Sequence, residues 1–145
     1  MRHIEDALQK SIVRYWDLRH PRLSLHLVCV PNGGKRNAAE AAKFKQMGVR
    51  PGFPDLLLAL PNRFYPFMGI ELKTARGRQS EHQKEYQRLF EQMGAKYVLV
   101  RSLDEFIRIT EDYLKYYDND IPTARLPAEG QRFGGSLFPE QGKAE

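Results

Sequence analysis

A pair of short apolar segments joined by a turn constrains the fold of this chain more than any other feature. The first segment covers residues 56–60 and the second residues 68–74, and the positions between them are rich in proline, asparagine and aromatic residues. Apolar runs of this length bounded by turn residues are typical of β-strands, so the two segments predict a β-hairpin. Helical patterns lie on both sides of the hairpin. The chain is therefore expected to form an α/β fold, with a sheet covered by helices.

Four segments around the hairpin carry apolar residues at helical spacing or residues that cap helices. They predict helices over about 3–18, from Asn37 to Met47, from Ser80 to Met93, and from Ser102 to about Tyr117. Two of these helices begin with the spacing of a capping box, a serine followed three residues later by Gln83 or Glu105. Further strands are predicted at 23–30 and 97–100. The predicted order is α-β-α-β-β-α-β-α, a mixed sheet flanked by helices.

Two acids and a lysine fall on the predicted hairpin. Asp55 stands at the start of the first strand, directly after a proline, and Glu71 and Lys73 lie in the second strand. Because side chains alternate between the two faces of a strand, Glu71 and Lys73 point to the same side. Two carboxylates can hold a hard cation such as Mg²⁺, which acts as a Lewis acid on a phosphate and lowers the pKa of its bound water. A nearby lysine can orient that water, so the three residues suit metal-dependent hydrolysis of phosphodiesters.

Simpler interpretations exist for each of these residues. Glu71 and Lys73 on one strand face can form an exposed ion pair worth under about 1 kcal/mol, and an acid after a proline is often a turn residue. Gln83 is accounted for by the helix cap alone. Glu5 falls in the first turn of a helix, where acids are favoured by the helix dipole.

The bulk properties of the chain favour one basic domain. The chain has 145 residues and a formal net charge of +5, which suits a polyanionic partner. Its single cysteine, Cys29, allows no intrachain disulfide, and no apolar run is long enough to cross a membrane. A soluble, cytoplasmic protein is expected. Residues 1–117 are predicted to form the domain and residues 118–145, which lack periodicity, an irregular tail.

Basic residues cluster in three loops that should border the two acids. They are Lys35 and Arg36 in the first loop, Arg50 in the second, and Arg76 and Arg78 in the third. Basic side chains in such loops are what contacts to a DNA backbone require, and these contacts carry affinity without sequence information. Scattered arginines are also common on solvated surfaces. Direct base recognition is not indicated.

The ordered set of motifs resembles the VRR-NUC family of the PD-(D/E)xK nuclease superfamily. The resemblance covers about residues 1–115. It rests on Glu5, residues 31–33, the approach 48–55, Glu71 and Lys73, then Gly77, Ser80 and Gln83, and finally the region of Val98 and Asp104. It implies a restriction-endonuclease-like fold. It also implies that Asp55, Glu71 and the backbone carbonyl of Leu72 bind the metal, that Lys73 is the catalytic lysine, and that Gln83 and Glu5 complete the site.

The same resemblance implies a DNA endonuclease that uses Mg²⁺ or Mn²⁺ in a bacterial or phage-infected cell. Small members of the family are associated with branched DNA, including four-way junctions and flaps, and symmetric cutting of a junction would require a homodimer. Two alternatives stay open at the level of sequence. One is a catalytically inactive DNA-binding module that keeps the nuclease fold, and the other is a protein-interaction domain whose basic charge is incidental.

Overall fold

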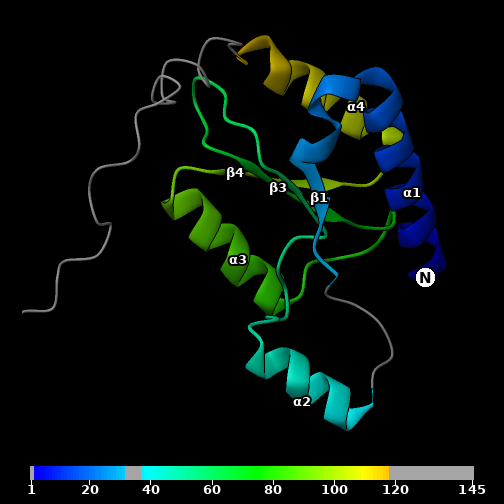
Figure 1. Cartoon of the computed structure of the whole chain (residues 1–145), viewed down its shortest axis with the longest axis vertical. Coiled ribbons are helices and arrows are strands. Elements are labelled where there is room, and N and C mark those ends of the chain that lie inside the picture. The colour runs from blue at the N-terminus through cyan, green and yellow to red at the C-terminus, as the bar shows by residue number, and fades with distance from the viewer. Residues whose placement is uncertain (1, 32–36, 118–145) are drawn as a thin grey trace, which may run out of the picture.

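A four-stranded mixed sheet forms the centre of the molecule (Figure 1). The computed structural model describes residues 2–31 and 37–117. The strands are β1 (Leu27–Cys29), β2 (Leu56–Leu58), β3 (Met68–Leu72) and β4 (Lys96–Val100), in the spatial order β1-β2-β3-β4. β1, β2 and β3 are antiparallel neighbours, and β4 lies parallel to β3. The predicted hairpin is therefore confirmed as β2 and β3.

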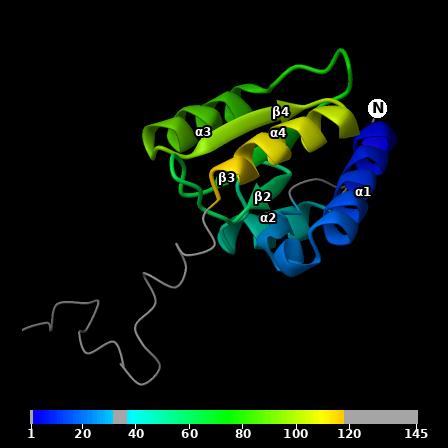
Figure 2. The same ribbon diagram turned by 90° about the horizontal axis from the view of Figure 1, so that it is seen from above.

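Helices cover both faces of this sheet. They are α1 (Arg2–Arg19), α2 (Ala38–Gln46), α3 (Glu81–Gln92) and α4 (Leu103–Lys115). α1 packs against α4 and β3, whereas α3 packs against β4. Figure 2 shows β4 between α3 and α4. α2 buries none of its residues and lies away from the sheet in Figure 1. The expected fold class and order of elements are confirmed.

The main core lies between the sheet and the α1–α4 pair. Trp16 and Phe106 are fully buried there, with ring centroids 6.2 Å apart, and they cover Leu56, Leu58 and Ile70 of the central strands. All five residues of β3 are buried because the strand has a neighbour on each side and helices on both faces. Any polar side chain on β3 is consequently removed from water.

Helix ends agree closely with the predicted caps. Asn37 and Ser102 each accept a hydrogen bond from a backbone N–H of their own first turn, and the Ser80–Gln83 capping box is complete. The Glu105 side chain departs from the predicted box, because it accepts from the N–H of Arg101 and not from that of Ser102. α2 and α3 are both followed by a glycine with positive φ, as the sequence indicates.

The strand predicted over 23–30 is largely wrong. Pro21–His26 forms a 3₁₀ helix, η1, and only Leu27–Cys29 is extended. Pro21 suits the first turn of a helix, and the Trp16 indole Nε1 donates to the carbonyl of Leu23 at 2.8 Å, which holds η1 against α1. A side-chain contact between two consecutive elements therefore overrides the apolar pattern.

Smaller differences concern burial. In α3 only Phe90 is buried, while Leu89 and Met93 are exposed although they continue the apolar spacing of the helix. Cys29, in β1, is exposed and accepts a hydrogen bond from the Gln9 amide. None of the described helices is long and apolar enough to span a membrane. Residues 118–145 lie outside the described part of the chain, so the predicted domain boundary stays a prediction.

Candidate metal-dependent hydrolytic site

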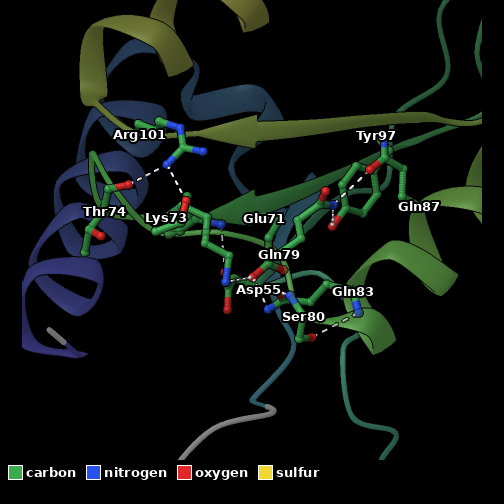
Figure 3. A network of polar contacts seen from close by, with 12 residues as sticks. Asp55, Glu71, Lys73, Thr74, Gln79, Ser80, Gln83, Gln87, Tyr97 and Arg101 are labelled. Carbon is green, nitrogen blue, oxygen red and sulfur yellow. Dashed lines mark hydrogen bonds and ion pairs between the residues drawn. The ribbon is translucent and has the colours of Figure 1, made fainter.

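The two acids and the lysine of the hairpin come together at one end of the sheet (Figure 3). Asp55 lies immediately before β2, Glu71 lies within β3, and Lys73 follows β3 directly. The Asp55 Oδ2 atom accepts a hydrogen bond of 2.8 Å from the backbone N–H of Leu72. The Lys73 Nζ atom lies 3.5 Å from Glu71 Oε1. Glu71 and Lys73 thus lie together, as strand alternation predicts, and the hydrogen bond to Leu72 holds Asp55 beside them.

Glu71 is the most confined member of the cluster. Its exposed fraction is 2%, and its Oε1 atom accepts a hydrogen bond of 2.7 Å from the Gln83 side-chain Nε2. Its Oε2 atom is buried, and no donor among the described residues reaches it; the Asp55 carboxyl is close enough to share a hydrogen bond with Glu71 only when one of the two acids is protonated. Burying a carboxylate oxygen without a partner is costly. The geometry of Glu71 therefore favours a further positive ligand at Oε2.

Burial and mutual repulsion raise the pKa values of both carboxyls. Removal from water, followed by the charge of Asp55, raises the pKa of Glu71 to about 8, against a smaller opposing effect of Lys73. The pKa of Asp55 is also raised, chiefly by burial, although the hydrogen bond from Leu72 opposes the shift. Two adjacent carboxyls that resist simultaneous ionisation are relieved when a cation lies between them.

The backbone carbonyl of Leu72 lies on the Asp55 edge of β3. The paired ladder of β2 and β3 ends at Leu56 and Ile70, and the chain bends at Asp55. Pro54 has left the ladder there, because its Cγ atom lies 3.0 Å from the position that a Cβ would take on Gly69. The Leu72 N–H therefore meets the Asp55 carboxylate and not a β2 carbonyl. Because the N–H and C=O of one strand residue point to the same edge, the Leu72 carbonyl is also directed to the Asp55 side.

These groups fit a hard divalent cation. Carboxylate oxygens of Asp55 and Glu71 and a backbone carbonyl are the oxygen ligands that Mg²⁺ and Mn²⁺ take, with water completing the shell. The described residues contain no cluster of three or more histidine, cysteine, aspartate or glutamate side chains that could hold a metal. The fit therefore rests on two carboxylates, the carbonyl of Leu72 and bound water.

Gln83 has two partners, which unites the two interpretations of this residue. Its Oε1 accepts from the N–H of Ser80 at 2.8 Å, closing the capping box, and its Nε2 donates to Glu71. Glu5, in the first turn of α1, makes no hydrogen bond or ion pair with the described residues of the cluster, yet its charge helps to raise the pKa of Asp55. The first turns of α1 and α3 thus both approach the acids.

A glycine brings the loop before Asp55 close to α3. Gly52 has φ +85°, and a Cβ atom there would lie 2.5 Å from the backbone carbon of His82. Only glycine permits this conformation and this approach without strain. Gly52 in the sequence 48–55 therefore helps to set the distance between Asp55 and the first turn of α3.

Arg101 is a residue near the site that sequence reasoning missed. Its guanidinium Nη1 donates to the carbonyls of Thr74 at 2.6 Å and Gly77 at 2.8 Å, which fixes the loop after Lys73 (Figure 3). Gln79, further along this loop, donates to the side chains of Gln87 and Tyr97. No motif identifies Arg101 in the sequence, because its partners are backbone carbonyls more than twenty positions away.

The basic residues predicted to contact DNA are only partly within the described structure. Arg50, Arg76 and Arg78 are exposed, with Arg76 and Arg78 in the loop held by Arg101. Arg50 also donates from Nη1 to the carbonyl of Lys45. Lys35 and Arg36 lie outside the described residues.

Comparison with known proteins agrees with this geometry. The sequence model of the VRR-NUC domain matches residues 4–104, which is more than half of the chain. The chain belongs to the VRR-NUC domain family. A solved structure titled "VRR_NUC domain protein" is similar to it, with a TM-score of 0.69 and 27% sequence identity over 79% of this chain and 91% of that one. None of the curated proteins compared gives a match.

VRR-NUC domains are nuclease-type domains that process DNA, and nucleases of this type generally use divalent metal ions. The matched segment begins in α1, ahead of Glu5, and ends in the first turn of α4. All the residues of the acid cluster therefore lie inside the VRR-NUC match.

Proposed function

We propose that this VRR-NUC domain is a Mg²⁺- or Mn²⁺-dependent DNA endonuclease that selects branched DNA such as four-way junctions or flaps. The observation that carries the proposal is the buried Glu71, whose Oε2 atom has no donor among the described residues, beside Asp55 and the Leu72 carbonyl. The presence of Lys73 favours a catalytic site over a site that only binds DNA, because its ammonium group lies against the Glu71 carboxylate.

Each residue has a distinct role in this proposal. Asp55, Glu71 and the carbonyl of Leu72 hold the metal, while Gln83 fixes the orientation of the Glu71 carboxylate through its 2.7 Å hydrogen bond. When bound, the metal lends Lewis-acid charge to the phosphate and acidifies a water molecule. Lys73 orients the attacking water and neutralises charge that develops on the phosphate oxygens. Glu5 assists from the first turn of α1.

The reaction itself is a hydrolysis. The oxygen of water forms a bond to phosphorus while one P–O ester bond breaks, and the departing alkoxide takes up a proton. One of the two new ends of the cut strand then carries a hydroxyl group and the other a phosphate monoester. Arg50, Arg76 and Arg78 are proposed to hold the flanking phosphates, together with Lys35 and Arg36.

Cleavage assays with matched variants test the proposal. Purified protein is incubated with linear, flap and four-way junction DNA in Mg²⁺, Mn²⁺ or EDTA, alongside Asp55→Ala and Lys73→Ala. We expect cutting only with metal, preferentially on branched DNA, and a loss of at least about 100-fold in each variant. Lys84→Ala is the matched control for a lysine, because Lys84 is exposed and pairs with Glu81 on the outside of α3.

Each part of the proposal can fail separately. Binding without cutting on every substrate would favour the inactive module, and equal cutting of linear and branched DNA would remove the structure selectivity. Full activity in Asp55→Ala would refute the site while leaving the enzyme class standing. Light scattering of the free and junction-bound protein tests the homodimer proposed for symmetric cutting of a junction.

A further inference from the structure

An apolar pocket lies next to the acid cluster, and of its lining residues only Arg50 has a role in the proposed hydrolysis. It has a volume of about 370 Å³, within the range of small-molecule sites. The lining residues come from the end of β1, the α2–β2 connection and α3; they are Val30, Met47, Gly48, Val49, Arg50, Phe53 and Tyr86. The lining of the pocket is therefore mostly apolar, with one exposed arginine, Arg50.

Three connections place this pocket beside the site. Phe53 precedes Asp55 by two residues, and Tyr86 follows Gln83 by about one turn of α3. The backbone N–H of Val30 donates to the carbonyl of Asp55 at 3.1 Å. The pocket and the acids therefore share the same short segments, and a nucleotide whose phosphate lies at the acids has its neighbours near the pocket.

The lining has the chemistry of a base-binding site. Phe53 and Tyr86 are half-buried and pack edge to face, with ring centroids 5.2 Å apart, so the aromatic wall is already ordered. Met47, 68% exposed, adds a polarisable thioether side chain to the lining. Arg50 supplies positive charge beside this wall. Aromatic walls next to a cation bind unstacked bases, with the cation at the phosphate.

We propose that this pocket binds one unpaired base of the DNA, next to the phosphate that is cut. The inference rests on the proposed nuclease function and deepens it. A base can enter the pocket only where it is unstacked, which is easiest at a flap, a junction or a frayed end. The pocket then gives a physical reason for selecting branched DNA without reading sequence.

The two helix C-caps provide a matched pair of variants. Met47 caps α2 and Met93 caps α3, with nearly the same backbone angles, and each is exposed and followed by a glycine of positive φ. Only Met47 lines the pocket. Met47→Glu therefore places a negative charge in the pocket, and Met93→Glu is the control for charge and for helix capping. Val49→Trp instead fills the pocket with a larger side chain and adds no charge.

The test combines these variants with DNA that lacks single bases. Flap DNA carries an abasic site at one position at a time around the cut, and binding is measured by fluorescence anisotropy in the Lys73→Ala background so that no strand is cut. We expect one abasic position to weaken binding by about 5-fold to 150-fold. That penalty should vanish in Met47→Glu and Val49→Trp and persist in Met93→Glu.

The outcomes separate this inference from the proposed function. A penalty of less than 2-fold at every position, or one that persists in both pocket variants, overturns the pocket even if the wild-type protein cuts flap DNA. Absence of cutting by the wild type refutes the nuclease proposal, and the binding measurements still decide on the pocket.

Discussion

At the scale of single residues, Glu71 holds the most information about this protein. An exposed ion pair with Lys73 was the simplest interpretation of the sequence, and the structure contradicts it, because Glu71 is 2% exposed. The absence of a donor at its Oε2 atom and its raised pKa both follow from the burial of a carboxylate. Such burial lowers the stability of the fold, so stability alone does not explain why the residue is a glutamate. Stability and the proposed metal-binding role would therefore oppose each other at Glu71.

The pH dependence of stability tests this opposition. Folding raises the pKa of Glu71 from its ordinary 4.5 to about 8, so the folded state holds a proton that the unfolded state has lost. The free energy of unfolding of the metal-free protein should therefore fall on this account as pH rises from about 4.5 to about 8. Glu71→Gln removes this dependence and should be more stable than the wild type by about 1 to 4 kcal/mol at pH 8.5.

Urea denaturation in EDTA at pH 5 and pH 8.5 measures the effect. Glu91→Gln is the control, because Glu91 is an exposed carboxylate on α3. Parallel pH profiles of the wild type and Glu71→Gln would contradict the raised pKa. The same variant should be inactive, since it loses a carboxylate of the metal site.

At the scale of elements, the end of the β2–β3 ladder creates the site. β2 pairs with β3 only as far as Leu56 and Ile70, and the bend at Asp55 lets its carboxylate, in place of the β2 backbone, accept from the Leu72 N–H. The first turn of α3 then closes the site, with Ser80 and Gln83 capping the helix while Gln83 also reaches Glu71. A strand end and a helix start thus serve both folding and the site.

Variants of the cap separate the two roles of Gln83. Ser80→Ala removes only a cap acceptor and should lower the free energy of unfolding by about 1 kcal/mol while cleavage stays within about 3-fold. Gln83→Ala also removes the donor to Glu71 and should lower the cleavage rate by at least about 10-fold at a similar cost in stability. An equal loss of activity in both variants would show that Gln83 acts through the helix alone.

At the scale of the whole molecule, α1 and α3 lie on opposite faces of the sheet and bring their first turns to the same acids. Helix N-termini favour negative charge, which suits two carboxylates and a phosphate. The loop held by Arg101 adds Arg76 and Arg78 near the same end. The net charge of +5 suits a polyanionic partner in general, and in the proposed function these loops would direct DNA to the site.

The salt dependence of DNA binding tests which charges take part. Arg76→Gln should reduce the slope of log K against log salt by about 0.9, the value for one phosphate contact on duplex DNA. Arg108→Gln, on an exposed position of α4, should leave the slope unchanged. Anisotropy titrations between about 50 and 200 mM salt without Mg²⁺ provide the measurement. Equal slopes for both variants would place the DNA elsewhere.

Local sequence signals determined much of this protein. Turn residues and apolar runs gave the β2–β3 hairpin, cap residues gave the starts of α2, α3 and α4, and strand alternation placed Glu71 and Lys73 together. All of these depend on residues a few positions apart. The order of helices and strands was therefore predictable before the fold was known.

Contacts between distant segments decided the rest. The burial of Glu71 depends on Gln83 and on strands to either side, and the loop after Lys73 depends on Arg101. The pocket forms only where the α2–β2 connection meets α3. The periodicity of one helix or strand carries no information about its contacts with distant segments. The sequence by itself therefore named the acids and the lysine, whereas the tertiary structure alone decided their burial, their pKa values and the space beside them.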